Sequence, residues 1–374
     1  MKKILYVVST LKRSGPTNQL YNLVKHLDRN LFDLHLITLS AETEDSRWKD
    51  FENLGVNLYS LNLSRIKGFF LAKKKVKCLI QKIKPDLIHT QGIRADVMSS
   101  QMNLRIPKLC TVHNYPQQDY VMRYGKLQGL AMLKAHLHAL KKIDLCVGVS
   151  KSVERNLNSN YHISNTTNIK NGVDTELYHV VSYKQQIVLR NKLKLPKDAK
   201  LWVSSGHLSE LKDPLFLIEN WYSAFGNVND FYLVLLGGGP LQEKCAEFSA
   251  NMNNVLVKGR VTNVVEFLQA SDYFVSCSKA EGLPMAVIEA LGSGLPCILS
   301  DISPHAEIFE TCSSPGALYE LGDSGSFKSS LKKTLNFDYH EMQQAALNLI
   351  ENNLSATVMA NEYQAEYLKL LNKK

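Results

Sequence analysis

The sequence predicts an α/β protein with two doubly wound parallel sheets, and three observations lead to this prediction. The chain has 374 residues, which exceeds the size at which one hydrophobic core usually divides, so two domains of about 150–200 residues are expected. Short apolar runs recur in both halves of the chain, with stretches of helical pattern between them. Such continuous runs are typical of parallel strands covered by helices on both faces. Because the series occurs twice, each half should form its own sheet, with ligands at the carboxyl ends of the strands.

The predicted strands follow these apolar runs in order. In the first half they are Ile4–Ser9, Leu34–Leu39, Val56–Leu61, Asp86–Thr90, Lys108–Val112 and Asp144–Val149. In the second half they are Leu201–Ser205, Tyr232–Leu236, Val255–Val257, Tyr273–Ser276, Pro296–Leu299 and Ala317–Tyr319. Asn171-Gly172 between the two series is a strong turn signal, so the predicted domains are residues 1–172 and 173–354. A polar stretch covers residues 182–200, and residues 355–371 have a helical pattern.

The composition indicates an ordinary globular protein, with 45% apolar and 21% charged residues. No window approaches the roughly 20 uninterrupted apolar residues of a membrane helix. The start, MKKILYVVSTLKRSG, resembles a signal peptide, but its apolar run covers only Ile4–Val8 and no small-residue cleavage site follows. A buried first strand is therefore expected. The seven cysteines, at positions 78, 110, 146, 245, 277, 297 and 312, form no C-x-x-C motif, so reduced core thiols in a cytoplasmic protein are expected.

The net charge of +9 is unevenly distributed along the chain. Residues 1–170 contain 27 Lys and Arg against 12 Asp and Glu, a net +15, whereas residues 171–374 contain 17 against 23, a net −6. This asymmetry predicts that the first half meets a polyanion or an anionic membrane surface. Two basic stretches stand out, Arg65–Lys84 around Phe69 and Phe70, and Arg123–Lys142. They fit peripheral contact with anionic lipid, and the alternative is a pair of solvated amphipathic helices.

The most informative stretch runs from Asp272 to Asp301. An apolar run ends in a turn that carries Glu281, and a helix is expected to start at Pro284 and to carry Glu289. Proline suits the first helical position because its φ is fixed and it has no N–H. The free N–H groups of that first turn, with the helix dipole, form a site for a phosphate. Two carboxylates around such a site fit a nucleotide sugar, which has a diphosphate between two hydroxylated groups, and the alternative is a pair of solvated surface glutamates.

The segments EGLP at 281–284 and ALGSGLP at 290–296 resemble the donor-site signature of retaining glycosyltransferases of the large family 4 type. The resemblance implies two Rossmann-like domains facing across a cleft, the glycosyltransferase B fold, with residues 355–374 crossing back to the first domain. It implies that Glu281 accepts hydrogen bonds from donor-sugar hydroxyls and that Glu289 holds the ribose hydroxyls. The residues expected at the diphosphate are Gly282, Leu283, Met285 and Ala286.

Three other segments of the second half also resemble this family. SSGHL at 204–208, followed by Lys212, resembles an element in which an Arg and a Lys five residues later contact the donor diphosphate. Lys212 matches the Lys, Gly206 lies in the loop, and His207 replaces the Arg without the charge and fork of a guanidinium. LGGGPL at 236–241 resembles a strand-end turn, and KGRV at 258–261 resembles the segment whose backbone, at Val261, meets the nucleobase.

The first half matches the family more loosely. The loop Lys12–Thr17 corresponds to the family's glycine-rich loop, of which Gly15 remains, and Thr17 is expected to begin a helix. His113, at the end of a predicted strand, sits where the family places a His near the donor sugar and the leaving phosphate. Ser150 is expected to cap a helix.

These features together predict a cytoplasmic, membrane-peripheral retaining glycosyltransferase with Glu281, His113 and Lys212 as catalytic residues. It would move a sugar from a nucleotide diphosphate donor, UDP-linked, to a hydroxyl of a saccharide or lipid-linked glycan. Neither a metal nor another cofactor is expected, because no D-x-D motif occurs. A glycosidase pair is disfavoured because eight residues of helix rise about 12 Å, beyond the roughly 5–9.5 Å such pairs need.

Three alternatives remain open on the sequence. The first is a sugar epimerase or phosphorylase with the same fold. The second is an inactive binding or scaffold protein, which His207 and the reduced glycine loop would permit. The third is a basic nucleic-acid-binding protein. Only the positive charge of the first half supports it, and no recognition motif occurs, so no nucleic acid partner is expected.

Overall fold

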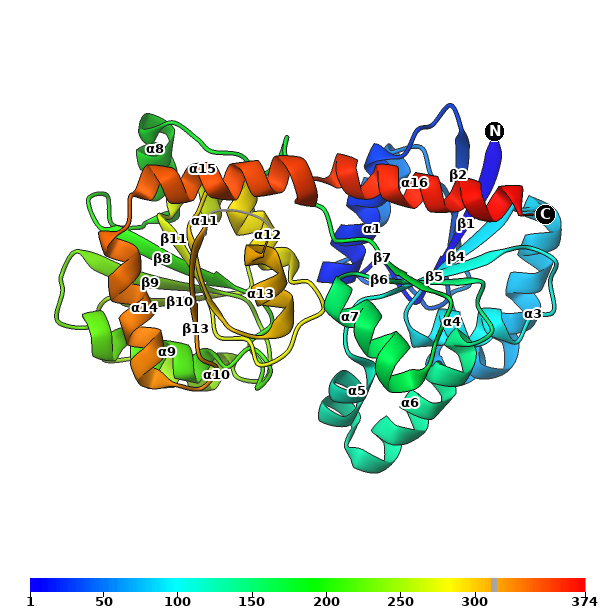
Figure 1. Ribbon diagram of the computed structural model, residues 1–374, viewed down its shortest axis with the longest axis horizontal. Helices are drawn as coiled ribbons and strands as arrows, with labels where there is room; N and C mark the ends of the chain where they lie inside the picture. Colours follow the sequence, from blue (N-terminus) through cyan, green and yellow to red (C-terminus); the bar gives the residue numbers. More distant parts are fainter. Residues whose placement is uncertain (311–314, 374) are drawn as a thin grey trace. The chain divides into compact units, whose positions relative to one another are not determined.

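The computed structural model describes residues 1–310 and 315–373, without the side chains of Arg65, Ile66, Lys67, Phe69 and Arg123. Cys312, one of the expected core thiols, lies outside the described residues. The chain divides into two compact units, drawn in Figure 1: unit 1 is Met1–Gly172 with Ala356–Lys374, and unit 2 is Val173–Ser355. Each unit is built on a parallel sheet, so the prediction of two doubly wound domains is confirmed.

Within the described residues, unit 1 has a seven-stranded sheet in the order β3-β2-β1-β4-β5-β6-β7. The strands are β1 (Lys2–Val8), β2 (Phe32–Thr38), β3 (Asn57–Ser60), β4 (Leu87–Gln91), β5 (Lys108–Val112), β6 (Leu145–Gly148) and β7 (Thr166–Asn168). The first six coincide with the predicted apolar runs. The sequence gives no apolar signal for β7, because it reads TTN and is only half-buried at the edge of the sheet.

Helices cover both faces of this sheet, as the continuous apolar runs indicate. The helices are α1 (Gly15–His26), α2 (Trp48–Asn53), α3 (Arg65–Ile83), α4 (Ile93–Ser100), α5 (Pro116–Tyr124), α6 (Lys126–Leu140), α7 (Lys151–Arg155), the π-helical turn Asn156–Asn160 and α16 (Ala356–Asn372). In β1, Ile4 and Tyr6 pack into a core shared with α1 and α16. Leu5 and Val7 point to the opposite face, into a core shared with α3 and α4.

The last helix, α16, is part of the core of unit 1. The hydroxyl of Tyr367 lies 2.6 Å from Nδ1 of His89, and that of Tyr363 lies 2.8 Å from Oγ1 of Thr111. Both tyrosines are fully buried. The helix that follows unit 2 in sequence therefore completes the hydrophobic core of unit 1.

Unit 2 has a six-stranded sheet within its described residues, in the order β10-β9-β8-β11-β12-β13. The strands are β8 (Lys200–Ser205), β9 (Phe231–Leu236), β10 (Val255–Gly259), β11 (Tyr273–Ser276), β12 (Cys297–Ser300) and β13 (Gly316–Tyr319). The helices are α8 (Tyr183–Leu193), α9 (Pro214–Phe225), α10 (Gln242–Phe248), α11 (Val264–Ala270), α12 (Met285–Gly292), α13 (Ser303–Phe309), α14 (Ser324–Asn336), α15 (Tyr339–Leu349) and the π-helical turn Ile350–Leu354. Trp202, fully buried, stacks on Tyr273 with ring centroids 4.9 Å apart.

Helix starts differ from the sequence predictions at three places. The polar stretch 182–200 contains α8, whose start is a capping box in which Ser182 and Gln185 exchange hydrogen bonds. Helix α1 begins at Gly15 rather than Thr17, because Ser14 is its N-cap and accepts from the Thr17 N–H. Helix α12 begins at Met285, with Pro284 as the extended N-cap residue rather than the first helical residue. Ser150 caps α7 as expected, accepting from the Val153 N–H at 3.1 Å.

Five of the described cysteines are buried as expected, but Cys78 on α3 is exposed. All six described cysteines are free thiols. Among the helices in the described part of the chain, none combines the length and the apolar character that crossing a bilayer requires.

Candidate functional site

The predicted donor residues of unit 2 lie in loops that leave the carboxyl ends of its strands and on α12, which follows one of these loops. Strand β8 pairs with β9 on one side and with β11 on the other, so the strand order reverses between β8 and β11. In open α/β sheets, such a switch point leaves a crevice where ligands bind. The loop after β8 carries Gly206, His207 and Lys212, and the loop after β11 carries Glu281. The structure thus brings two segments that are about 70 residues apart in sequence to the two sides of one switch point.

The glycines after β9 set the path of the loop after β8. A Cβ at Gly237 would lie 1.8 Å from the carbonyl oxygen of Gly206, and a Cβ at Gly239 would lie 2.4 Å from that of Leu208. Both glycines also have positive φ, at 142° and 155°. The Leu208 N–H donates to the Gly238 carbonyl at 3.0 Å. These glycines therefore let two backbones approach closely, which fixes Gly206 and the exposed His207 at the end of β8.

Lys212 and Glu281 form an ion pair across the switch point. The Lys212 ammonium donates to Oε1 of Glu281, and the Ser278 hydroxyl donates to the same oxygen at 2.8 Å. The Glu281 side chain is 12% exposed and that of Lys212 is 27% exposed. Lys279 joins the same loops a second time, because its N–H donates to the Leu211 carbonyl at 2.8 Å. The loops after β8 and β11 are thus held together through both main chain and side chains.

The charge state of Glu281 follows from these contacts. Burial alone would raise the pKa of this carboxyl, but the charge and hydrogen bond of Lys212, with the Ser278 hydrogen bond, hold the pKa below its usual range. Glu281 is therefore an ionised carboxylate at neutral pH, able to accept hydrogen bonds from hydroxyl groups.

A chain of hydrogen bonds that no sequence motif indicates supports the Glu281 loop from behind. The Ser300 hydroxyl donates to the Ser278 carbonyl at 2.6 Å, and Nδ1 of His305 donates to the Ser300 carbonyl at 2.9 Å. Burial lowers the pKa of His305 to about 4, so the ring is neutral at pH 7. Its Nε2, buried and without a hydrogen-bond partner in the described structure, is then an acceptor. Ser278 follows β11, Ser300 ends β12 and His305 lies on α13, so their contacts depend on two strands being neighbours and no local pattern reveals them.

The N-terminus of α12 follows directly after Glu281 and Gly282. Leu283, Pro284 and Met285 are buried and Ala286 is half-buried. No side chain caps this helix. The Val287 N–H donates to the Pro284 carbonyl at 3.2 Å, so the N–H groups of Met285 and Ala286 are the ones that an anion could meet at the positive end of the dipole. Glu289 lies about one turn further along the helix and is 7% exposed.

Val261 is placed further along the same edge of the sheet. It follows β10 and is half-buried, and β10 is separated from β8 by β9. A ligand that extends from Glu281 toward Val261 would therefore cross the ends of β8 and β9. This order along the edge suits an elongated molecule rather than a compact one.

Gly15 and His113 belong to unit 1, whose strand order reverses between β1 and β4. Gly15, the first residue of α1, follows β1 at this switch point, and His113 follows β5, the neighbour of β4. Nε2 of His113 donates to Oε1 of Gln91 at 3.2 Å, and Nε2 of Gln91 donates to Oε1 of Gln19 at 3.0 Å. Burial lowers the pKa of His113 to about 4, so its ring is neutral and Nδ1 is an acceptor. Gln19 and Gln91, both buried, were not among the predicted site residues.

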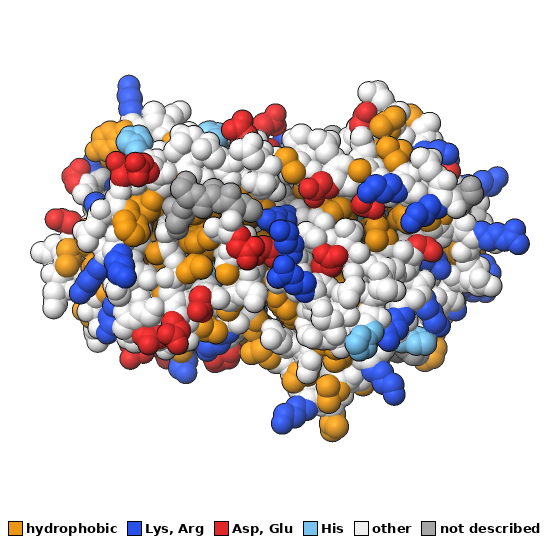
Figure 2. Space-filling model, in the orientation of Figure 1, with side chains coloured by type: hydrophobic (Ala, Val, Ile, Leu, Met, Phe, Trp, Pro, Cys, Tyr) orange, Lys and Arg blue, Asp and Glu red, His pale blue; other side chains and the backbone are white. Residues whose placement is uncertain are grey.

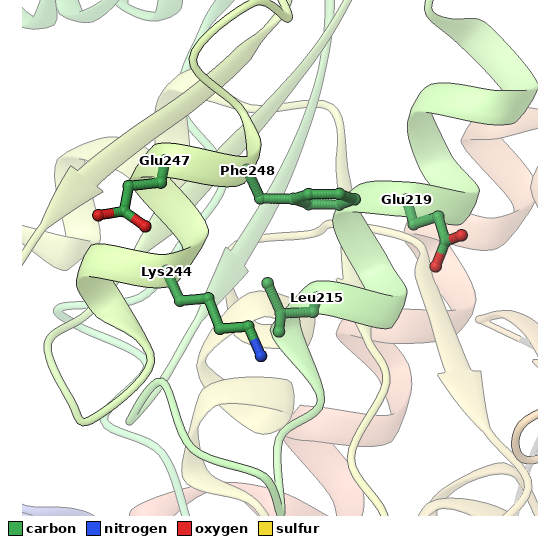
Figure 3. Close-up of a pocket in the computed structure, with 5 residues that line it drawn as sticks. All are labelled: Leu215, Glu219, Lys244, Glu247 and Phe248. Atoms are coloured by element: carbon green, nitrogen blue, oxygen red, sulfur yellow. The ribbon is translucent and has the colours of Figure 1, made fainter.

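A hollow elsewhere in unit 2 lies between α9 and α10 (Figure 3). It is lined by Leu215, Glu219, Lys244, Glu247 and Phe248. None of the predicted donor residues lines it, and its lining residues are not on strand-end loops but on helices.

Among the described residues, no three His, Cys, Asp or Glu side chains are arranged to hold a metal ion.

Each half of the chain matches a known glycosyltransferase family. Residues 13–177 match the family described as Glycosyltransferase Family 4. Residues 185–352 match the family described as Glycosyl transferases group 1. Together the two matches cover most of the chain, and each falls on one of the two units.

Individual relatives are glycosyltransferases of bacterial and archaeal origin. An uncharacterized glycosyltransferase of Methanocaldococcus jannaschii is 28% identical over 61% of this chain and 58% of its own length. The UDP-Gal:alpha-D-GlcNAc-diphosphoundecaprenol alpha-1,3-galactosyltransferase of Escherichia coli is 29% identical over 54% of each chain. The chain thus matches little more than half the length of these two relatives. The capsular polysaccharide biosynthesis glycosyltransferase CapH of Staphylococcus aureus is 23% identical over 98% of this chain and 100% of its own length.

Solved structures share the fold over the whole chain. Anabaena HepE, in complex with UDP and glucose, has a TM-score of 0.81 at 18% identity and covers 99% of this chain and 100% of its own. The sucrose-phosphate synthase of Thermosynechococcus elongatus has a TM-score of 0.84 at 16% identity, with 100% of each chain covered. At these identities the likeness concerns the fold, which is the glycosyltransferase B fold.

Proposed function

Because this chain belongs to the glycosyltransferases that join a family 4 half to a group 1 half, we propose that it moves a sugar from a UDP-linked donor to a hydroxyl of a saccharide or lipid-linked glycan. The observation that carries the proposal is the Lys212–Glu281 pair beside the uncapped N-terminus of α12, at the switch point of unit 2. It supplies a cation, free N–H groups and an ionised carboxylate within one site.

The parts of a nucleotide sugar match these groups one by one. The diphosphate suits the Lys212 ammonium and the first-turn N–H groups of α12. The sugar hydroxyls suit the Glu281 carboxylate, and the ribose hydroxyls suit Glu289 further down the helix. The base would then lie toward Val261. Lys212 is paired with Glu281, so a diphosphate would compete for the ammonium and leave the carboxylate to the sugar.

The transfer breaks the bond between the anomeric carbon and the diphosphate oxygen and forms a bond to the acceptor oxygen. Negative charge grows on the departing diphosphate, and donors that are fixed beforehand stabilise it most. The hydrogen bonds among the loops after β8, β9 and β11 hold Lys212 and Glu281 in place, and the Glu281 loop leads directly into α12. We propose that the anomeric configuration is retained and that no metal takes part, on the basis of the E-x7-E arrangement and the lack of a D-x-D motif.

His113 of unit 1 is proposed to contact the donor sugar or the leaving phosphate. Its Nε2–H is already engaged by Gln91, so the neutral ring offers Nδ1 as an acceptor for a sugar hydroxyl. Gln19 and Gln91 would act as positioning residues for this ring.

The identity of the relatives supports the substrate class. The E. coli relative acts, by its name, from UDP-Gal on a diphosphoundecaprenol-linked sugar, and the S. aureus relative belongs to capsular polysaccharide biosynthesis. A role in cell-surface polysaccharide synthesis is therefore part of the proposal. The basic surface of unit 1, including the exposed Lys73 and Lys74 on α3, supports a peripheral position on the cytoplasmic face of an anionic membrane.

A donor screen tests the proposal directly. UDP-, GDP-, ADP- and dTDP-sugars are compared by the rise in melting temperature and then by slow hydrolysis, with and without EDTA. UDP-sugars should stabilise the protein and release UDP, and NMR of the released or transferred sugar should show the donor's anomeric configuration. Stabilisation by no nucleotide sugar, or release that EDTA abolishes, would contradict the proposed site or its metal-free chemistry.

A further inference from the structure

The α5–α6 hairpin of unit 1 ends in a cluster of exposed apolar side chains. Met122 is 53% exposed, Tyr124 41%, Leu127 90% and Leu130 49%. Figure 2 shows hydrophobic side chains at the end of this hairpin, with Lys or Arg side chains beside them. Single exposed apolar residues are ordinary, but a contiguous group of large ones marks a site of interaction. We call these four residues the apolar tip.

The charge around the apolar tip is mostly positive, with Asp119 in the first turn of α5 as the acidic residue of the hairpin. Residues 120–143 contain no Asp or Glu but five basic residues, Arg123, Lys126, Lys134, Lys141 and Lys142. The four lysines are exposed. On α6, Leu127, Leu130, Lys134 and Lys141 recur at helical spacing along the solvent side, while Leu133 and Leu140 face the core. The outward face of α6 therefore runs from apolar at the turn to basic further along.

The two helices of the hairpin pack closely against each other and are hydrogen-bonded to α4. A Cβ on Gly129 of α6 would lie 2.6 Å from the Tyr120 carbonyl oxygen of α5, which shows how closely the two helices pack. A buried polar chain fastens both helices to α4. The Tyr120 hydroxyl lies 2.8 Å from Nδ1 of His136, and Nε2 of His136 lies 2.9 Å from Oδ2 of Asp96. All three side chains are buried, so these contacts support the hairpin from behind while the apolar tip stays exposed.

We propose that the α5–α6 hairpin inserts its apolar tip into the interface of an anionic lipid bilayer. Apolar side chains at a helix end would enter the boundary between headgroups and acyl chains, and the lysines behind them would meet lipid phosphates. The basic hairpin is complementary in charge to an anionic bilayer. A second copy of the same hairpin is a less favourable partner, because its like charges would repel. The inference deepens the proposed membrane contact by naming the element that inserts, in addition to the lysines of α3.

Leu127→Ser/Leu130→Ser tests insertion, since both side chains are exposed and their loss leaves the core intact. Each leucine taken out of lipid should weaken partitioning roughly tenfold or more. Leu177→Ser/Val188→Ser is the matched control, because these unit 2 side chains are 49% and 59% exposed. Lys126→Gln/Lys134→Gln/Lys141→Gln removes charge from the same hairpin and should lose mainly the salt-dependent part of binding.

Binding is measured by co-sedimentation with phosphatidylglycerol–phosphatidylcholine vesicles at low and high salt, without any nucleotide sugar. The wild type and the unit 2 control should bind alike, and the leucine variant should bind roughly a hundredfold more weakly. Tyr124→Trp should be quenched by brominated lipids. Vesicle binding unaffected by the leucine variant, or lost only in a variant of Lys73 and Lys74, would overturn the inference.

Two further readouts separate this inference from its rivals. If analytical ultracentrifugation shows a dimer that the leucine variant loses, the apolar tip is an interface between copies and the proposal is wrong. Donor hydrolysis in solution should be equal in wild type and leucine variant. A chain that binds vesicles through the tip yet hydrolyses no donor would contradict the transfer reaction and leave the membrane contact standing.

Discussion

Lys212 and Glu281 are joined by an ion pair that connects the loop after β8 with the loop after β11. The two residues are the cation and the carboxylate that the sequence assigned separately to the diphosphate and the sugar. Their pairing means that the two opposite charges compensate each other. It also makes Lys212 a cause of the depressed pKa of Glu281.

Lys212→Met should destabilise unit 2 most strongly at neutral pH. Removing the ammonium leaves a carboxylate that is only 12% exposed without its partner, at a cost of about 1–3 kcal/mol. In the wild type the pKa of Glu281 is depressed, so its stabilising contribution is present above the unfolded pKa and is lost as pH falls through the folded pKa. In the variant burial raises that pKa, so stability should recover as pH falls toward 5. Urea unfolding at pH 7.5 and 5 checks this, and Lys212→Met/Glu281→Gln should abolish the pH effect.

Glu281→Gln and Glu289→Gln should differ in which kinetic constant they change. Glu281 is proposed to hold the reacting sugar, so its loss should lower kcat, whereas Glu289 is proposed to hold the ribose, so its loss should raise KM. A charge-assisted hydrogen bond contributes about 1.5–3 kcal/mol, which corresponds to roughly ten- to a hundredfold. Steady-state kinetics at several donor concentrations distinguishes the two effects. If kcat/KM stays unchanged in both variants, the donor site lies elsewhere.

The fold was predictable from the sequence wherever burial on both faces leaves a continuous apolar run. Twelve strands were found in this way, from β1 to β6 and from β8 to β13. Strand β7 was missed because it is short, polar and half-buried. Helix α8 was missed although Ser182 and Gln185 carry a capping-box signal, because its face is polar and only Arg190 is buried.

The individual residues of the candidate site were predictable from the sequence, but the contacts between them were not. Local motifs indicated Lys212 and Glu281, yet their contact depends on β8 and β11 being neighbours, which only the topology decides. The same holds for His305, which reaches the Glu281 loop through the end of β12. Gln19 and Gln91 connect α1 and β4 to His113, and each residue alone gives no signal in the sequence.

Gly237→Ala should damage both stability and donor binding. The added Cβ would meet the Gly206 carbonyl, and the positive φ of Gly237 already disfavours a side chain. Backbone strain of this kind costs about 1–3 kcal/mol, and relief would displace the loop that carries His207. Gly322→Ala is the control, because Gly322 also has a positive φ of 81° but nothing lies near its Cβ. Melting temperature and UDP affinity should both fall in Gly237→Ala, whereas a UDP affinity equal to that of Gly322→Ala would count against the loop's role.

His207→Arg should strengthen binding of a nucleoside diphosphate. His207 is exposed in the loop after β8, so an arginine fits without disturbing the core and brings a fixed charge with a bidentate fork. A new charge-assisted hydrogen bond predicts roughly ten- to a hundredfold tighter binding. Calorimetry with UDP at pH 7.5 measures it, with His207→Gln as the variant that keeps hydrogen bonding without charge. Equal affinity of the arginine and glutamine variants would show that this loop does not meet the diphosphate.

His113→Gln should reduce the loss of stability that acid causes. Burial lowers the pKa of His113 to about 4, whereas an unfolded histidine titrates near 6.5. Between these values the unfolded chain binds a proton that the folded chain does not, so stability falls as pH falls through this window. Near pH 5 the variant should take up about one proton fewer on unfolding than the wild type. The proton count follows from the slope of unfolding free energy against pH, with the exposed His340→Gln as control. Equal slopes for His113→Gln and the wild type would mean that His113 titrates normally, and that its ring is not held neutral beside Gln91.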